Sequence, residues 1–146
     1  MELDKFKNAP DILEPDEVRK LFEELLAMPK PANDESAIEI TLALSEVADR
    51  QWHTYSLLDK QTMRALDNWI AVNWNPSSER MTELLIGIIA NVGLPNALEL
   101  MKNAVDSGLP HSVRNIISDA LVRFGSSVND PYRMHKVGLQ KARQNS

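Results

Sequence analysis

Two Gly-Leu-Pro triplets, at residues 93–95 and 108–110, constrain the fold of this chain more than any other feature. Glycine readily adopts the left-handed conformation that ends a helix, and proline fits the first turn of the next helix. Each triplet therefore predicts a sharp corner between two helices. The segment between the triplets is then one short helix, whose inward residues are expected to extend to Val105.

Apolar residues recur at helical spacing through most of the chain, and no segment alternates as a strand would. The stripe at positions 18, 21, 22, 25 and 26 is typical of an amphipathic helix. We expect helices to begin near residues 15, 34, 58, 76, 95 and 110, and a last helix to cover residues 131–143. Ser56 and Asn75 are the expected caps of the third and fourth helices. The second helix is expected to end near Arg50, with Leu42 on its core side.

Three of these helices end alike, at residues 43–48, 88–93 and 120–125. Each ending has two apolar residues, two spacers, one apolar residue and a small residue. The shared apolar position falls at Leu44, Ile89 and Leu121, and such self-similarity is typical of helix-pair arrays with a unit of roughly 40 residues. One helix pair leaves an apolar face uncovered, and a neighbouring pair can cover it.

Residues 110–125, with Val113, Arg114, Phe124 and Gly125 at the matching positions, resemble the second helix of a HEAT repeat. The resemblance implies an all-α fold of about six to seven helices in stacked antiparallel pairs, with Arg114 in a ladder between repeats. Residue 48 is alanine where the repeat has glycine, and residue 82 is threonine where it has arginine. These departures keep an irregular helical bundle as the alternative. Either fold is expected to form one domain over residues 1–146, with 1–14 and 144–146 loosely ordered.

The sequence lacks the residues that several kinds of chemistry require. The chain has no cysteine, so disulfides and thiolate metal sites are excluded. It has no glycine-rich phosphate loop and no metalloprotease or hydrolase motif. The histidines, His53, His111 and His135, have no ligand partner at helical spacing, so neither a metal nor a cofactor is expected. Because no secretory signal or membrane-spanning run is visible, we expect a cytoplasmic location and no membrane partner.

The charge is unevenly distributed along the chain. Residues 1–60 hold 14 acidic and 7 basic residues, whereas residues 61–146 hold 7 acidic and 9 basic residues. An acidic first half disfavours nucleic acid as a partner, because phosphate binding requires clustered bases. It favours a basic protein partner through electrostatic steering. A solvated acidic face that only maintains solubility is the alternative explanation.

The sequence therefore predicts a non-enzymatic protein-interaction module. One concrete instance is an acidic immunity protein that neutralises a basic bacterial toxin. An adaptor that docks a helix or peptide in a groove is a second hypothesis, and an enzyme with an unrecognised helical site, to which His53 and His111 would belong, is a third. The expected contact residues are the polar positions of the second, fourth and sixth helices and two tryptophans at helix ends, because tryptophan often anchors interfaces: Glu39, Glu46, Trp52, Trp74, Glu79, Glu83, Arg114, Ser118 and Arg123.

Overall fold

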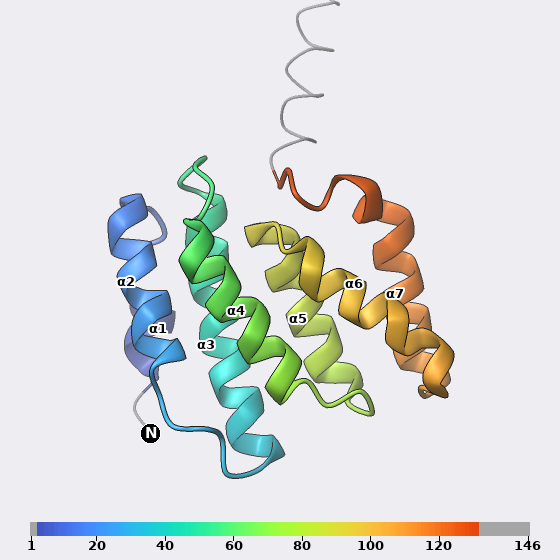
Figure 1. The fold of residues 1–146 in the computed structure, drawn as a ribbon. Coiled ribbons are helices and arrows are strands. Elements are labelled where there is room, and N and C mark those ends of the chain that lie inside the picture. Colours follow the sequence, from blue (N-terminus) through green and yellow to red (C-terminus); the bar gives the residue numbers. More distant parts are fainter. Residues whose placement is uncertain (1–2, 132–146) are drawn as a thin grey trace, which may run out of the picture.

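A computed structural model describes residues 3–131 of the chain. All the regular secondary structure of this part is helical (Figure 1). Two short 3-10 turns, η1 (Val105–Ser107) and η2 (Gly125–Ser127), follow the last two helices. The helices of the described part are α1 (Asp4–Asn8), α2 (Pro15–Leu26), α3 (Asp34–Trp52), α4 (Lys60–Asn73), α5 (Glu79–Val92), α6 (Pro95–Ala104) and α7 (His111–Phe124).

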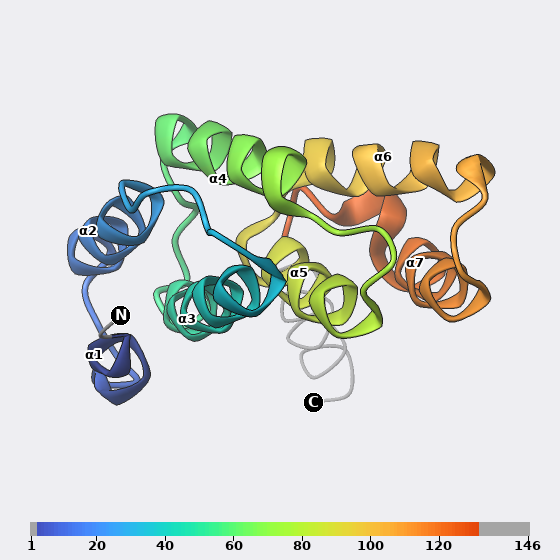
Figure 2. The ribbon, with the colours of Figure 1, turned by 90° about the horizontal axis from the view of Figure 1, so that it is seen from below.

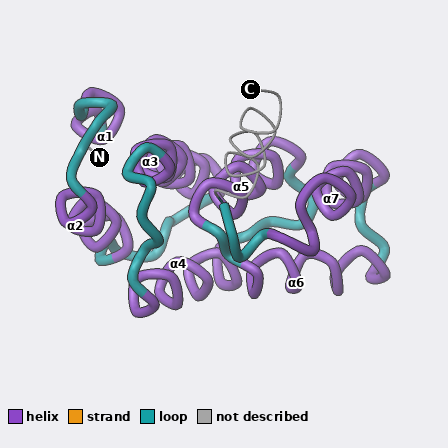
Figure 3. Tube along the Cα trace, turned by 90° about the horizontal axis from the view of Figure 1, so that it is seen from above, coloured by secondary structure: helices purple, strands orange, loops and turns teal. Residues whose placement is uncertain are grey.

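The helices lie in two layers (Figures 2 and 3). One layer contains α1, α3, α5 and α7 in that order, and the other contains α2, α4 and α6. Each helix contacts the one two places along the chain, and the layers meet where α2 packs on α3 and α6 packs on α5 and α7. The all-α prediction is confirmed for residues 3–131. A stack of helix pairs would give this order of contacts, but a true repeat stays a prediction beside the irregular bundle.

The core lies between the two layers. It is made of fully buried aliphatic side chains such as Leu44, Leu66, Ile88 and Ile117, and removing such apolar surface from water is the main force that holds the layers together. Helix α5 lies between α3 and α7 and is buried on several sides, as its nearly continuous apolar sequence predicts. The prediction that Leu42 faces the core is wrong, because its side chain is exposed on α3.

The Gly-Leu-Pro corner at residues 93–95 forms as predicted, since Gly93 ends α5 and Pro95 begins α6. At the second corner α6 ends earlier than predicted, Gly108 follows the 3-10 turn η1, and Pro110 is the N-cap of α7 instead of its first residue. Gly93 and Gly108 have φ angles of 86° and 83°, in the left-handed region that side chains other than glycine rarely adopt. Gly93 has a second reason to be glycine, because a Cβ there would lie 3.0 Å from the carbonyl oxygen of Val128. Val105 follows the end of α6 and lies in the 3-10 turn η1, where it is only partly buried. Gly125 is different again, since it keeps a right-handed conformation and leads into η2.

Three further helix boundaries differ from the prediction. Helix α3 continues through Trp52, two residues beyond Arg50. The cap of α4 is Asp59, whose carboxylate accepts a hydrogen bond from the Thr62 backbone N–H, whereas Ser56 bonds within the preceding turn.

The cap of α5 is Ser78, which accepts a hydrogen bond from the Met81 N–H. Asn75 instead accepts a hydrogen bond from the backbone N–H of Ser77. The predicted caps Ser56 and Asn75 are both wrong for the same physical reason. Several side chains near the start of a helix can cap it, and the path of the chain selects one of them.

The N-terminal segment contains a helix that the sequence analysis did not place. Helix α1 is only five residues long, and it packs on α3 through Phe6, which is fully buried. A helix this short has no stability of its own, so its contacts with α3 must hold it in place. The helix expected over residues 131–143 and the end at 144–146 lie outside the described residues, except for Pro131.

Candidate functional site

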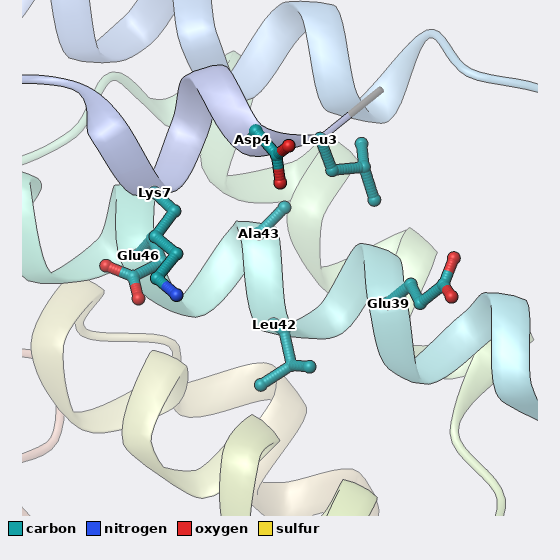
Figure 4. Close-up of a pocket in the computed structure, with 7 residues that line it drawn as sticks. All are labelled: Leu3, Asp4, Lys7, Glu39, Leu42, Ala43 and Glu46. Atoms are coloured by element: carbon teal, nitrogen blue, oxygen red, sulfur yellow. The ribbon is translucent and has the colours of Figure 1, made fainter. Parts of the chain in front are cut away.

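A groove of about 400 Å³ runs between α1 and α3 on the side of α3 that faces away from the core (Figure 4). We call it the acidic groove. Its floor is apolar, because Leu3, Leu42 and Ala43 line it. Its remaining lining is charged and comprises Asp4, Lys7, Glu39 and Glu46.

The wall formed by α1 is held by a buried cation. Arg50 is only 3% exposed, and its Nη2 donates hydrogen bonds to the carbonyl oxygens of Lys7 at 3.0 Å and Ala9 at 2.8 Å. Its Nη1 donates to the Glu46 carboxylate at 2.7 Å. Arg50 thus binds one carbonyl of α1, that of Lys7, and one just after the helix, that of Ala9, at the end where the helix dipole is negative. A buried guanidinium needs such partners, because burying an unpaired charge is costly.

The carboxylates of the acidic groove differ in how they are paired. Glu46 forms the ion pair with Arg50. Within residues 3–131, neither Asp4 nor Glu39 has an ion-pair partner within 4.0 Å, and both are exposed. Two exposed carboxylates against one exposed lysine, Lys7, beside an apolar floor present a surface that a basic and partly apolar segment would complement.

A second groove, of about 410 Å³, lies between α5 and α7. We call it the α5–α7 groove. Its two helices belong to the same layer as α1 and α3, which form the acidic groove (Figure 2). Most of its lining residues are apolar or small, namely Ile86, Gly87, Ala90, Ile116 and Phe124. The other three are charged, namely Glu83, Asp119 and Arg123.

The structure brings some of the predicted contact residues into these grooves. Glu39 and Glu46 line the acidic groove, and Glu83 and Arg123 line the α5–α7 groove. The other polar candidates are exposed but line neither groove: Glu79, Arg114 and Ser118. The predicted face therefore separates into two grooves and an exposed remainder.

The two tryptophans of the prediction have different surroundings. The indole N–H of Trp74 donates a hydrogen bond to the Thr82 hydroxyl at 3.0 Å, and the ring packs on the core. Trp74 therefore has an internal role in joining the end of α4 to α5. Trp52 lies at the end of α3 in an aromatic cluster, with ring centres 5.3 Å from His53 and 5.9 Å from Tyr55. Neither ring lines one of the two grooves.

The described histidines are placed apart from one another. Nδ1 of His53 lies 2.8 Å from the backbone oxygen of Asp49, and His111 is exposed at the start of α7. Residues 3–131 hold no group of three or more histidine and acidic side chains that could bind a metal ion together. His135 lies outside the described residues.

Two carboxyl groups with shifted pKa values act at helix starts instead of lining a groove. Burial raises the pKa of Asp59, but hydrogen bonds from the backbone and hydroxyl of Thr62 lower it more, so this pKa lies below its usual value. Burial raises the pKa of Asp67 above its usual value, against the lowering effect of hydrogen bonds from Asn96 and from the Ala97 backbone. Asp67, on α4, thus faces the first turn of α6.

A third shifted carboxyl belongs to an exposed ion pair. The hydrogen bond from Arg19 lowers the pKa of Asp16 on α2, and the same contact raises the pKa of Arg19. Arg19 also binds Glu23 one turn further along the helix. Such exposed pairs along one helix contribute little to stability.

The sequence pattern did not reveal the two buried residues that hold α1 against α3 beside the acidic groove, Arg50 and Phe6. Arg50 was expected to mark the end of a helix, and Phe6 lies in a segment expected to be loosely ordered. One signal was available in each case. Glu46 precedes Arg50 by one helical turn, which favours an ion pair, and Phe6 is a bulky apolar residue among charged ones.

No protein-family model, curated protein or solved structure matches this chain. Among the helices of residues 3–131, none combines the length and the apolar character that crossing a bilayer requires.

Proposed function

We propose that this chain is a protein-binding module that docks a basic segment of a partner protein in the acidic groove. The observation that carries the proposal is the pairing of an apolar floor with two exposed carboxylates, Asp4 and Glu39, that have no ion-pair partner among the described residues and outnumber the one lysine of the lining, Lys7. An apolar floor favours a side chain such as leucine, and the carboxylates favour lysine or arginine beside it.

The walls of the groove support this function because they are fixed before a partner arrives. The Arg50 hydrogen bonds and the buried Phe6 hold α1 against α3. A preformed groove loses little conformational entropy on binding, so more of the contact energy contributes to affinity. The charged rim would mainly raise the association rate, and this effect weakens as salt increases.

The immunity-protein hypothesis is a special case of this proposal. In that case the partner is a basic toxin, and binding through the acidic groove blocks its activity. An adaptor would use the same groove without inhibiting its partner. An assay of the partner's own activity, with and without the bound chain, separates the two cases.

The proposal is tested with two charge-reversed variants of the tagged full-length chain. The double variant Asp4→Lys/Glu39→Lys changes the acidic groove. The matched control is Glu17→Lys/Glu99→Lys, because both residues are exposed, belong to the other helix layer, and have no ion-pair partner among the described residues. Asp4 and Glu17 also share a place in the first turn of a helix, and both double variants change the net charge equally.

The partner is recovered from the native host at low salt with the unaltered chain and is then purified. We expect the groove variant to weaken its binding by about tenfold or more and the control to bind within about twofold of the unaltered chain. Equal loss in both variants would mean that only net charge matters. Equal retention in both, or the absence of any salt-dependent protein partner, would contradict the proposal.

A further inference from the structure

Gly87 lies in the middle of α5 and is exposed at the floor of the α5–α7 groove. A Cβ added at this position would meet no atom within 4 Å. Its φ angle is not among the positive values found at Gly93 and Gly108. Neither crowding nor backbone conformation within the described residues therefore requires glycine here.

Glycine in a helix interior is nevertheless unfavourable, because the unfolded chain has more freedom to lose than with alanine. Because glycine has no side chain, a glycine on a helix surface allows another backbone or a bulky side chain to approach the helix closely. Ala90, one turn further along α5, lines the same groove. Together these two residues leave the groove open between the larger side chains of α5 and α7.

The charges at the groove describe the occupant further. Glu83 and Asp119 are exposed and have no ion-pair partner within 4.0 Å among residues 3–131. Arg123 lies near the end of α7, with its guanidinium 5.9 Å from the centre of the Phe124 ring. Two carboxylates against one guanidinium favour an occupant that is basic along most of its length.

We propose that the α5–α7 groove is a second contact site for the same partner, and that its occupant is an amphipathic helix. An apolar side chain of this helix lies over Gly87, and its basic edge faces Glu83 and Asp119. The inference rests on the proposed function, because one partner binds both grooves. Helix-in-groove docking of this kind uses apolar anchors at helical spacing with charges along the edge.

The first test needs no partner. The variant Gly87→Ala is compared with the unaltered chain by thermal unfolding. Because the added methyl group meets open space and alanine favours the helix, we expect the unfolding temperature to rise by about 2–5 °C. A fall in the unfolding temperature would show that the fold itself needs glycine, and it would overturn the inference.

The second test measures binding directly with a defined probe. The probe is a synthetic helical peptide with leucine on one face and lysine along one edge, titrated into the isotope-labelled full-length chain and followed by backbone amide shifts. We expect shifts in residues 83–90 and 116–124. The variant Gly87→Leu, which fills the floor, should weaken binding by about tenfold or more, while the control Ala71→Leu, at an exposed position on α4, should not.

The results separate this inference from the proposed function. If the charge-reversed groove variant weakens partner binding but the probe peptide causes no shifts at the α5–α7 groove, the proposed function stands and the second contact site is wrong. If Gly87→Leu binds the probe as tightly as the unaltered chain does, the inference also fails. If the probe binds at Gly87 but no basic partner uses the acidic groove, the α5–α7 groove is a site of its own and the single-partner model is wrong.

Discussion

The two grooves lie in one helix layer, but their walls are held by different interactions. The acidic groove has one wall of only five residues, which depends on the hydrogen bonds of Arg50 and on a single buried ring, Phe6. The α5–α7 groove lies between two 14-residue helices that pack through several buried aliphatic side chains. The first wall is thus held by a few contacts, polar ones at its end and one buried ring, and the second by apolar packing along its length.

This difference predicts different responses to mutation. Hydrogen bonds to a buried guanidinium are directional and few, so losing one residue should release the whole wall. Apolar packing is distributed, so losing one side chain should weaken the region without changing its path.

The substitution Ile117→Ala should be the most destabilising change. Ile117 is fully buried on α7, and truncating such a residue costs about 2–5 kcal/mol of unfolding free energy because a cavity remains. Chemical denaturation measures this loss. The matched control on the same helix is Val122→Ala, which removes a side chain that is 87% exposed and should change stability by less than about 0.5 kcal/mol. Equal losses for both variants would contradict the packing of α7.

The substitution Arg50→Ala should cost about 1–3 kcal/mol, because two carbonyls of the α1 segment lose their charged donor. Hydrogen–deuterium exchange should show faster exchange in residues 3–11 and unchanged exchange in α7. The control Arg19→Ala removes a more exposed arginine that pairs with Asp16 and Glu23 and should have less effect. Unchanged exchange at α1 would show that Arg50 does not hold this wall.

The substitution Asp59→Ala should cost about 1 kcal/mol through loss of the α4 cap. Helix α4 contacts both α2 and α6, so this change should affect both halves of the molecule alike. The pKa of Asp59 is lowered in the folded state, so the contribution of its charge is present above the unfolded pKa of about 3.9 and is lost as the pH falls through the folded value. The difference between the variant and the unaltered chain should therefore shrink under acid. A difference that grows under acid would contradict this account.

The substitution Asp67→Asn should have the smallest effect at neutral pH, because the amide can still accept a hydrogen bond from the Ala97 backbone. The pKa of Asp67 is raised by burial, so the stabilising contribution of the protonated group is full below the unfolded pKa and is lost as the pH rises through the folded value. The variant should therefore gain stability relative to the unaltered chain as the pH rises from acid to neutral. Denaturation at several pH values tests this, and the opposite trend would exclude burial as the dominant cause.

The sequence predicted the parts of the fold that local physics decides. Proline and glycine fix helix ends wherever they occur, so the corners at Gly93 and Gly108 were predictable. The apolar stripe of α2 was predictable for the same reason, since a period of 3.6 residues is a local property. The choice between Ser56 and Asp59 as a cap was not predictable, because both residue types cap helices equally well in isolation.

Tertiary contacts decided the rest of the candidate site. Helix α1 is too short to be visible as a periodic pattern, and Arg50 becomes buried only because the segment around Ala9 folds back onto α3. Leu42 was assigned to the core by its spacing, but it lines the acidic groove. The acidic character of the groove was nevertheless predictable, because Glu39 and Glu46 lie two turns apart on one helix.

If the acidic groove binds a basic protein segment, a hydrogen–deuterium exchange footprint of the full-length chain should show protection there. The measurement compares the free chain with the chain bound to its purified partner, at low and at high salt. We expect slower exchange in residues 3–7 and 39–46 on binding, with the protection reduced at high salt. Protection confined to α2, α4 and α6, or protection of the groove that salt does not change, would contradict it.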